Sequence, residues 1–564
     1  MNKSGSVIST LARWQNQWRI LWLNRQVAAH AEVPPEASQA PVVFFNASTR
    51  ITGLSQNAAF ALLTSQGLRL AGIPVQHFVC RSGMSHCVLG TNRQDHHRPP
   101  PCQDCLRQSQ RLYAGADVHW FDFHPNPALE KALYDLDIDQ LSQFEFPLQL
   151  PGQPAPGSSH LPLGRLVLPS IRWALRRHTL PEDEQTRYLM RQYMLSAYHV
   201  AEQFAAFLHQ ASPRTVVIFN GAMYPEAAAR WASLQMGFRT VTHEVGFQPF
   251  SAFFTEGEAT AYPIHIPEEF ELSAEQNARL DAYLEKRFQG KFSMAGIRFW
   301  PEMRGLDADM LRKIAQFKQL VPVFTNVAYD TSQVHANQVF PSMFAWLDLV
   351  LELIRSHPET LFVIRAHPDE MRPGTAKLSR ESVHDWVHHH AVHTLPNVIF
   401  IDSQEYLSSY ELIQRAKFVI VYNSSIGMEA TLMGVPVLCG GKARYTQYPI
   451  VFFPTSPQSY QEMAETFLEA KKIELPPEFQ RNARRFLYYQ LYRASLSFAE
   501  YLQEGPRKGF VHLRPFSWRE LLPNHSPTLQ ILANDLSSAA QPANPALFTI
   551  PGDLPLLSPD GVSV

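Results

Sequence analysis

The 564-residue sequence lacks a surplus of either charge, because 49 lysines and arginines stand against 51 aspartates and glutamates. The composition therefore predicts no broad basic surface, and nucleic acid is not expected as a partner. Charged residues are also scarce at 18%, whereas the hydrophobic share of 45% is ordinary for a globular protein. A chain of this length can form two or more domains, each with its own core.

Long hydrophobic runs are missing too. No run of 18 apolar residues predicts a membrane-spanning helix, and the N-terminal stretch through Leu23 lacks the features of a secretory signal. Residues 8–29 instead predict an amphipathic helix that carries Arg13, Arg19 and Arg25. Two interpretations stay open: the helix packs on the protein's own surface, or it attaches to an anionic membrane. We expect a cytoplasmic protein, with peripheral attachment at the inner face of the membrane as the alternative.

Common nucleotide-binding and hydrolase motifs are absent from the sequence. The Walker A pattern, the GxGxxG pattern and the GxSxG pattern do not occur. Their absence lowers the case for ATPase, dehydrogenase or hydrolase chemistry.

Cysteine is rare, and four of the five cysteines are clustered at Cys80, Cys87, Cys102 and Cys105. Disulfides are disfavoured in the cytoplasm, and the Cys-x-x-Cys half of the cluster fits a structural zinc site. Six residues separate Cys80 from Cys87, which is more than usually separates paired ligands in such a site. Structural zinc, a redox pair and plain thiols therefore all remain open.

The sequence contains two series of short apolar strands that alternate with helical patterns, which indicates parallel sheets covered by helices. The predicted fold class is α/β and GT-B-like, with two doubly wound Rossmann-type domains facing across a cleft. The expected strands of the first series are 42–45, 74–79, 216–219 and 240–243, and those of the second are 321–325, 361–364, 398–401, 418–421 and 435–438.

Composition shifts suggest the domain organisation. The expected parts are an N-terminal helix and linker (1–40), an acceptor-side α/β domain with a Cys-rich loop and a helical insertion (41–300), a donor-binding α/β domain (301–475), a crossing helix (476–510) and a proline-rich tail (511–564) that is extended or partly disordered.

Two motifs of the second series carry the chemistry: Arg365-Ala366-His367-Pro368 and Asn423-Ser424-Ser425-Ile426-Gly427-Met428-Glu429. Each follows a predicted buried strand, and ligands of open α/β sheets bind at that edge. Ser424 and Ser425 at a helix start offer hydroxyl and N–H groups to an anion, and His367 offers phosphate a donor or a positive charge. Glu429, one turn into the helix, can accept hydrogen bonds from a sugar hydroxyl. The motifs together predict a nucleotide-sugar site.

Further residues complete the predicted site. Arg365 could pair with phosphate or with Glu429, and Lys442 follows two glycines that would let the backbone approach a diphosphate. Asn326 and Asn423 each follow a strand of the second series. In the first series, Glu244 or His243 could act as the base of an inverting transfer, whereas a retaining transfer would need no such base.

These motifs, with Thr325–Asp330, Gly434–Val437 and Gly441–Tyr445, resemble those of the capsule polysaccharide biosynthesis type of glycosyltransferase over about residues 320–455. Related His-Pro and Ser-Ser motifs occur in bacterial polysialyltransferases, Kdo transferases and teichoic-acid glycerophosphotransferases. The resemblance implies a GT-B glycosyltransferase that moves a sugar from a nucleotide-activated donor to a growing surface polysaccharide or lipid-linked acceptor. It also implies that His367 and the serines contact the donor phosphates, and we expect no catalytic metal. The alternatives are transfer of glycerol phosphate from a CDP-linked donor, or a non-catalytic member of a polysaccharide assembly complex.

Overall fold

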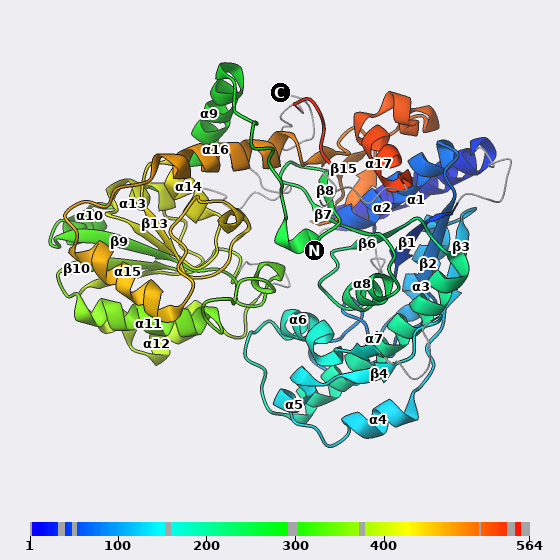
Figure 1. Ribbon diagram of the computed structural model, residues 1–564, viewed down its shortest axis with the longest axis horizontal. Helices are drawn as coiled ribbons and strands as arrows, with labels where there is room; N and C mark the ends of the chain where they lie inside the picture. The colour runs from blue at the N-terminus through cyan, green and yellow to red at the C-terminus, as the bar shows by residue number, and fades with distance from the viewer. Residues whose placement is uncertain are drawn as a thin grey trace. The chain divides into compact units, whose positions relative to one another are not determined.

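The computed structural model describes residues 3–31, 40–47, 53–152, 159–290, 303–371, 378–506, 509–538 and 548–553. The chain divides into two compact units (Figure 1). Unit 1 comprises residues 1–174, 180–262 and 490–564, and unit 2 comprises residues 175–179 and 263–489. The expected boundary near residue 300 differs from this division, because α9 (Ala274–Phe288) lies in unit 2.

Unit 1 is built on a seven-stranded sheet with the order β14-β8-β7-β6-β1-β2-β3. The five strands from β7 to β3 are parallel, and β8 and β14 are antiparallel to their neighbours. Phe44 and Phe45 of β1 show why both faces are buried: Phe44 joins one hydrophobic cluster, while the ring of Phe45 meets that of Phe204 on the other face. The strands are β1 (Val42–Asn46), β2 (Val75–Cys80), β3 (Asp117–Phe121), β6 (Thr215–Phe219), β7 (Thr240–Val245), β8 (Ser251–Thr255) and β14 (Leu496–Ser497).

Helices cover both faces of this sheet. The helices of unit 1 are α1 (Lys3–His30), α2 (Gln56–Leu70), α3 (Cys102–Leu112), α4 (Pro127–Leu133), α5 (Ile138–Gln143), α6 (Leu163–Leu175), α7 (Glu184–Ala211), α8 (Glu226–Gln235) and α17 (Pro527–Ser537). Two antiparallel strand pairs, β4 (Phe146–Leu148) with β5 (Ser159–Leu161) and β15 (Leu502–Glu504) with β16 (Val511–Leu513), complete the unit.

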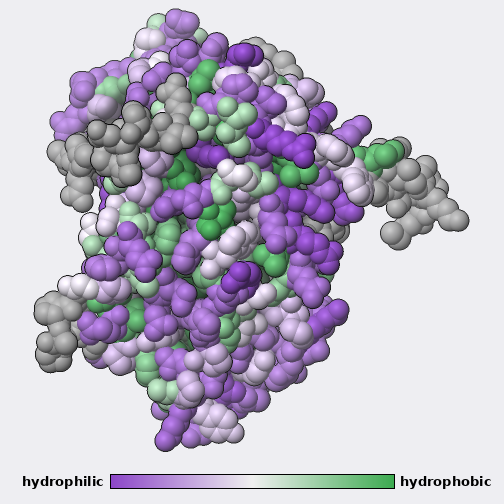
Figure 2. Space-filling view, turned by 90° about the vertical axis from the view of Figure 1, so that its right-hand side faces the viewer, coloured by the Kyte–Doolittle hydropathy of each residue, from purple (hydrophilic) through white to green (hydrophobic). Residues whose placement is uncertain are grey.

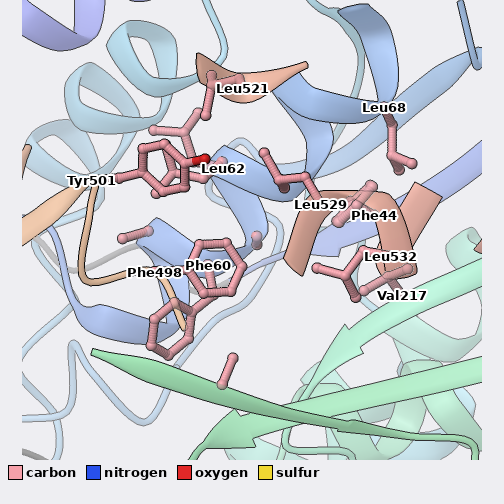
Figure 3. Packing of buried hydrophobic residues seen from close by; sticks show 14 of the residues in the cluster. Phe44, Phe60, Leu62, Leu68, Val217, Phe498, Tyr501, Leu521, Leu529 and Leu532 are labelled. Atoms are coloured by element: carbon pink, nitrogen blue, oxygen red, sulfur yellow. The ribbon is translucent and has the colours of Figure 1, made fainter. Parts of the chain in front are cut away.

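The described part of the proline-rich tail is folded, and the expectation of an extended or disordered segment is wrong for it. Figure 3 shows Leu521, Leu529 and Leu532 packed among residues of β1 and α2, with Phe60 and Phe498 in ring contact at 5.0 Å between centroids. The apolar residues of the tail do not recur at a spacing regular enough to predict a helix or strand. The leucines nevertheless form one side of the unit 1 core.

Replacing Leu532 with alanine is expected to cost about 2–5 kcal/mol of unfolding free energy, because its fully buried side chain leaves a cavity. Leu234 in α8 is a matched control, since it is 44% exposed and its replacement should cost well under about 1 kcal/mol. Urea unfolding measures both. If Leu532→Ala lost as little unfolding free energy as the control, the tail would not contribute to the core.

Unit 2 contains a five-stranded, wholly parallel sheet with the order β11-β10-β9-β12-β13. One hydrophobic cluster joins the sheet to α11, α12 and α15, and a smaller one joins the other face to α10 and α13 (Figure 1). The strands are β9 (Gln319–Phe324), β10 (Thr360–Arg365), β11 (Val398–Ile401), β12 (Val419–Val421) and β13 (Val437–Cys439). The further helices are α10 (Ala308–Ile314), α11 (Met343–Ser356), α12 (Val383–His389), α13 (Ser409–Arg415), α14 (Ile426–Leu432), α15 (Pro457–Glu469) and α16 (Pro477–Tyr492).

The predicted fold class, α/β with two doubly wound Rossmann-type units, is confirmed. The cleft between the two units stays a prediction. Among the described helices, none combines the length and the hydropathy needed to span a membrane. Figure 2 shows a face on which hydrophilic residues predominate and hydrophobic residues form small separate groups.

Candidate functional site

The order of the unit 2 sheet reverses between β9 and β12, since the chain adds β10 and β11 on one side of β9 and β12 and β13 on the other. Loops diverge at such a point and leave a crevice at the carboxyl ends of the strands, where ligands of this architecture bind. A pocket lies there. It is lined by Arg287, Met303, Phe324, Thr325, Arg365, Ala366, His367, Pro368, Ser409, Tyr410, Ser424, Ser425, Ile426 and Glu429.

Arg365, the last residue of β10, and His367 in the loop that follows both line the pocket. The Nδ1 atom of His367 accepts a hydrogen bond from the backbone N–H of Asp369 at 3.1 Å. In the neutral ring the proton is therefore assigned to Nε2, which leaves that nitrogen as a donor. Burial lowers the pKa of the Arg365 guanidinium to about 10, so this group is still positively charged at neutral pH.

Ser424 and Ser425 lie in the loop after β12 and also line the pocket. Ser425 is the N-cap of α14, but its side chain makes no capping hydrogen bond, so its hydroxyl is not used in helix capping. Gly427 has a packing role: a Cβ there would stand 2.4 Å from the hydroxyl of Tyr445, which donates to the carbonyl of Ser424 at 2.7 Å. Since α14 has seven residues, side chains rather than a long helix dipole must supply most of the attraction for an anion.

Glu429 lines the pocket with both carboxylate oxygens engaged. Nη2 of Arg287 lies 2.6 Å from Oε1, and the hydroxyl of Tyr410 donates to Oε2 at 2.6 Å. The open alternative of an Arg365–Glu429 ion pair is therefore not realised, because Arg287 of α9 takes that place. Arg287 and Tyr410 were not predicted, since they lie on helices whose approach to the motif leaves no signal in residue spacing.

Asn326 and Asn423 connect the ends of β9 and β12. The side-chain amide of Asn326 donates to Oδ1 of Asn423 at 2.7 Å, and Asn423 donates to the carbonyl of Ser332 at 3.1 Å. Neither is among the residues that line the pocket. Their geometry is that of residues that fix the two loops relative to each other.

Lys442 follows β13 and donates its backbone N–H to the carbonyl of Ala336 at 2.9 Å, and it is not among the pocket-lining residues. Gly440 and Gly441, which precede Lys442, allow close packing against two aromatic rings. A Cβ on Gly440 would stand 2.3 Å from the Trp346 ring, and one on Gly441 would stand 2.9 Å from the Tyr422 ring. A role of Lys442 in donor binding stays a prediction.

Glu244 is the second-last residue of β7 in unit 1, where the amides of Asn57 and Asn220 donate to its two carboxylate oxygens at 3.0 Å each. His243, the other candidate base, is buried and packs against Phe254. Burial lowers the pKa of His243 to about 3, so the ring stays neutral. Between the two candidates, the geometry favours Glu244.

Cys80, Cys87, Cys102 and Cys105 line one pocket of unit 1. None of the four forms a disulfide. Over the described residues, no set of three or more His, Cys, Asp or Glu side chains is placed to hold a metal ion as it stands. The structure thus brings the predicted cysteines together, and the zinc itself stays a prediction.

Glu370, which follows the His-Pro motif, is fully buried and accepts a hydrogen bond from the backbone N–H of Val383 at 2.8 Å. Burial raises the pKa of its carboxyl to about 8, and the carboxylates of Asp402 and Asp385 act in the same direction. The folded state therefore holds this proton more tightly than the unfolded state, whose carboxyl has an ordinary pKa near 4.5.

Unfolding free energy should consequently fall as pH rises from about 4.5 through about 8, by roughly 3–5 kcal/mol from this group. In Glu370→Gln, which mimics the protonated acid, this part of the pH dependence should vanish. Urea unfolding of both proteins at pH 5, 7 and 8.5 measures the difference. Parallel pH profiles would contradict the buried, protonated carboxyl.

Residues 292–450 match the family model described as "Capsule polysaccharide biosynthesis protein". This match confirms the family resemblance predicted from the motifs, over the part of the chain that carries most of the pocket. Protein FixF of Sinorhizobium fredii (strain NBRC 101917 / NGR234) is 26% identical over 245 residues, which are 42% of this chain and 50% of that protein. The chain therefore spans about half the length of the curated relative that it matches.

Solved structures show more distant similarity. The Thermosulfurimonas dismutans KpsC beta Kdo 2,4 transferase is 12% identical with a TM-score of 0.33, and the alignment covers 58% of this chain and 88% of that one. The Neisseria meningitidis UDP-GlcNAc 2-epimerase bound to UDP-GlcNAc is 15% identical with a TM-score of 0.22, covering 52% and 81%. Both TM-scores are low, so inference about function depends on the residues of the pocket.

Proposed function

We propose that the pocket of unit 2 binds the phosphates of a nucleotide-activated sugar, and that the protein transfers this sugar to a surface or capsular polysaccharide or a glycolipid acceptor. The observation that carries the proposal is the pocket at the reversal of the sheet order, with a buried arginine, a histidine donor and two serines. The capsule-biosynthesis match over residues 292–450 supports the same class of reaction.

Each side chain of the pocket has a role in this proposal. The Nε2–H group of His367 and the hydroxyls of Ser424 and Ser425 donate to phosphate oxygens, and Arg365 supplies a fixed positive charge. A buried arginine gains from an anionic ligand, because the ligand offsets the cost of keeping the charge out of water. Glu429 accepts from a hydroxyl of the ribose or sugar through its remaining lone pairs.

The transfer step follows from these roles. The acceptor oxygen attacks the anomeric carbon, the bond from that carbon to the phosphate oxygen breaks, and the departing phosphate gains negative charge. Arg365 and His367 stabilise that charge, so the reaction requires no divalent metal. Glu244, oriented by two amide donors, takes the acceptor's proton in an inverting reaction. Transfer should then persist in EDTA, and Glu244→Gln should abolish it without weakening donor binding.

A thermal-shift screen against CMP, CDP, UDP, GDP and dTDP tests the proposal. A nucleotide at about 100 times its Kd should stabilise the fold by about 2.7 kcal/mol. The double variant Ser424→Ala/Ser425→Ala should lose the response. Ser356→Ala, an exposed serine of the same unit, should keep it. A wild-type protein that responds to none of the five would overturn the proposal.

The same screen separates the two rival functions. A glycerol phosphate transferase would respond to cytidine nucleotides and would consume CDP-glycerol rather than a nucleotide sugar. A non-catalytic assembly protein would show no turnover of any donor, and its role in polymer production would survive both His367→Ala and Glu429→Ala.

We further propose that α1 attaches the protein to an anionic membrane, where a lipid-linked acceptor would lie. Trp14, Trp18 and Trp22 are 58%, 63% and 47% exposed, and their spacing of four places them along one face of the helix. The opposite face packs in unit 1 through Ile20, Leu23 and Val27. The helix contains four Lys or Arg residues and no Asp or Glu, which complements a negatively charged lipid surface.

Co-sedimentation with vesicles tests this attachment. Wild-type protein should bind vesicles that contain phosphatidylglycerol, and the triple variant Trp14→Ala/Trp18→Ala/Trp22→Ala should bind at least about tenfold more weakly, which corresponds to about 1.4 kcal/mol. Tyr134→Ala, which removes another exposed aromatic residue of unit 1, should bind like wild type. Equal binding by the triple variant would rule out the tryptophan face.

A further inference from the structure

The four clustered cysteines come from three separate segments of unit 1. Cys80 is the last residue of β2, Cys87 lies in the loop that follows, and Cys102 and Cys105 lie in the first turn of α3. All four nevertheless line the same pocket. This convergence at the carboxyl edge of the sheet cannot follow from chain proximity alone.

A backbone N–H group is directed at one of the sulfurs. The N–H of Gly83 donates to Sγ of Cys80 at 3.1 Å, and the N–H of Gly90 donates to the carbonyl of Cys87 at 3.1 Å. Both cysteines thus begin a Cys-x-x-Gly turn. An amide held in this way can also hydrogen-bond a metal-bound sulfur.

Glycine is required in both turns because neighbouring atoms leave no room for a Cβ atom. A Cβ on Gly83 would stand 2.2 Å from the ring of Phe121, and one on Gly90 would stand 2.6 Å from Pro100 and 3.1 Å from Sγ of Cys87. Any other residue would push the turn away from the sulfur. The shape of the turn after each of these two cysteines is therefore built into the chain.

The surroundings of the sulfurs limit what the pocket can bind. Its other lining residues are Ala47, Ser82, Met84, Leu89, Gly90, Pro100 and Pro101, none of which carries a charge. Polar organic ligands would find few partners there. Four thiols without a disulfide, facing a mostly apolar pocket, suit a metal that prefers sulfur.

We propose that this pocket binds a metal centre through the thiolates of Cys80, Cys87, Cys102 and Cys105, either as a zinc ion or as an iron–sulfur cluster. The two share one ligand chemistry, four cysteine thiolates. A single zinc ion needs all four sulfurs about 2.3 Å from one point. Since the described thiols are not placed to hold one ion as they stand, they must turn inward to bind zinc.

The centre would have a structural role. The chain between Cys80 and Cys102 contains no helix or strand, and a loop of this length inside a compact unit is uncommon without a further constraint. A metal centre would fix the loop at both ends and at Cys87. This inference is independent of the proposed sugar transfer.

Metal analysis of the full-length protein, purified without oxygen and without metal-affinity resin, tests the proposal. Elemental analysis should find either about one zinc, or about two or four irons with matching acid-labile sulfide. Cys102→Ser/Cys105→Ser should lose the metal. Cys439→Ser, which changes the fifth cysteine in unit 2, should keep it.

X-ray absorption of the wild-type protein covers the case in which the double variant does not fold. An all-sulfur coordination shell at the zinc or iron edge supports the proposal. Nitrogen or oxygen ligands from outside the four cysteines overturn it. Wild-type protein that stays free of zinc and iron, even after reconstitution with either metal, also overturns it.

Discussion

Replacing Arg287 with methionine is expected to destabilise unit 2 by about 3–5 kcal/mol. The side chains of Arg287 and Glu429 are each only 3% exposed, and Nη2 of Arg287 lies 2.6 Å from Oε1 of Glu429. Removal of the guanidinium leaves a buried carboxylate with Tyr410 as its remaining described hydrogen-bond partner. Chemical denaturation followed by tryptophan fluorescence measures the loss.

Two further variants show whether the effect comes from the buried charge. The double variant Arg287→Met/Glu429→Gln should recover at least about 2 kcal/mol, because it removes the uncompensated charge and keeps an acceptor for Tyr410. Arg481→Met, which breaks an exposed ion pair with Glu271 in the same unit, should cost little, because solvent screens exposed charges. Additive losses in the double variant would contradict this account of the pair.

Replacing His367 with alanine is expected to weaken binding of the nucleotide donor by about 10- to 150-fold. A hydrogen bond to a charged group contributes about 1.5–3 kcal/mol, and each 1.4 kcal/mol corresponds to a factor of ten. His367→Gln should keep part of the affinity, since its amide nitrogen can donate from nearly the position of Nε2. Isothermal titration calorimetry measures the three dissociation constants.

His389→Ala provides the matched control, because His389 is an exposed histidine of the same unit and is remote in sequence from both motifs. Its donor affinity should equal that of the wild type. If His367→Ala binds the donor as tightly as the wild type, His367 does not contact the phosphates.

Much of the fold could be predicted because buried parallel strands are short, apolar and rich in β-branched residues. The run from Leu361 to Ile364 predicted β10 within one residue at each end. The C-terminal leucines could not be predicted in this way. Prolines separate Leu521 from Leu529 and Leu532 of α17, and the burial of all three depends on α2, hundreds of residues earlier.

The candidate site was predicted only where its residues follow strands. Arg365, His367, Ser424, Ser425 and Glu429 all line the pocket of unit 2, because parallel strands end at one edge of the sheet, and their contacts with a donor stay a prediction.

The partners of these residues could not be predicted. Arg287 and Tyr410 reach the pocket from α9 and α13, and no spacing rule connects them with the Ser-Ser-x-Gly motif. Asn326 and Asn423 hydrogen-bond to each other, as two amides at adjacent strand ends readily do, and their role in donor binding stays a prediction. Sequence patterns thus locate the edge of the sheet, whereas tertiary packing decides which side chains there face a ligand.

Hydrogen–deuterium exchange of the full-length protein, with and without the nucleotide sugar selected by the thermal-shift screen, tests the central claim most directly. The claim is that the donor phosphates bind between the loops that follow β10 and β12. We expect slower exchange with donor in peptides that contain Ala366–Asp369 and Ser424–Gly427, and little change in peptides of α12 and α15. Protection confined to other segments, with exchange unchanged at these two loops, would contradict the account.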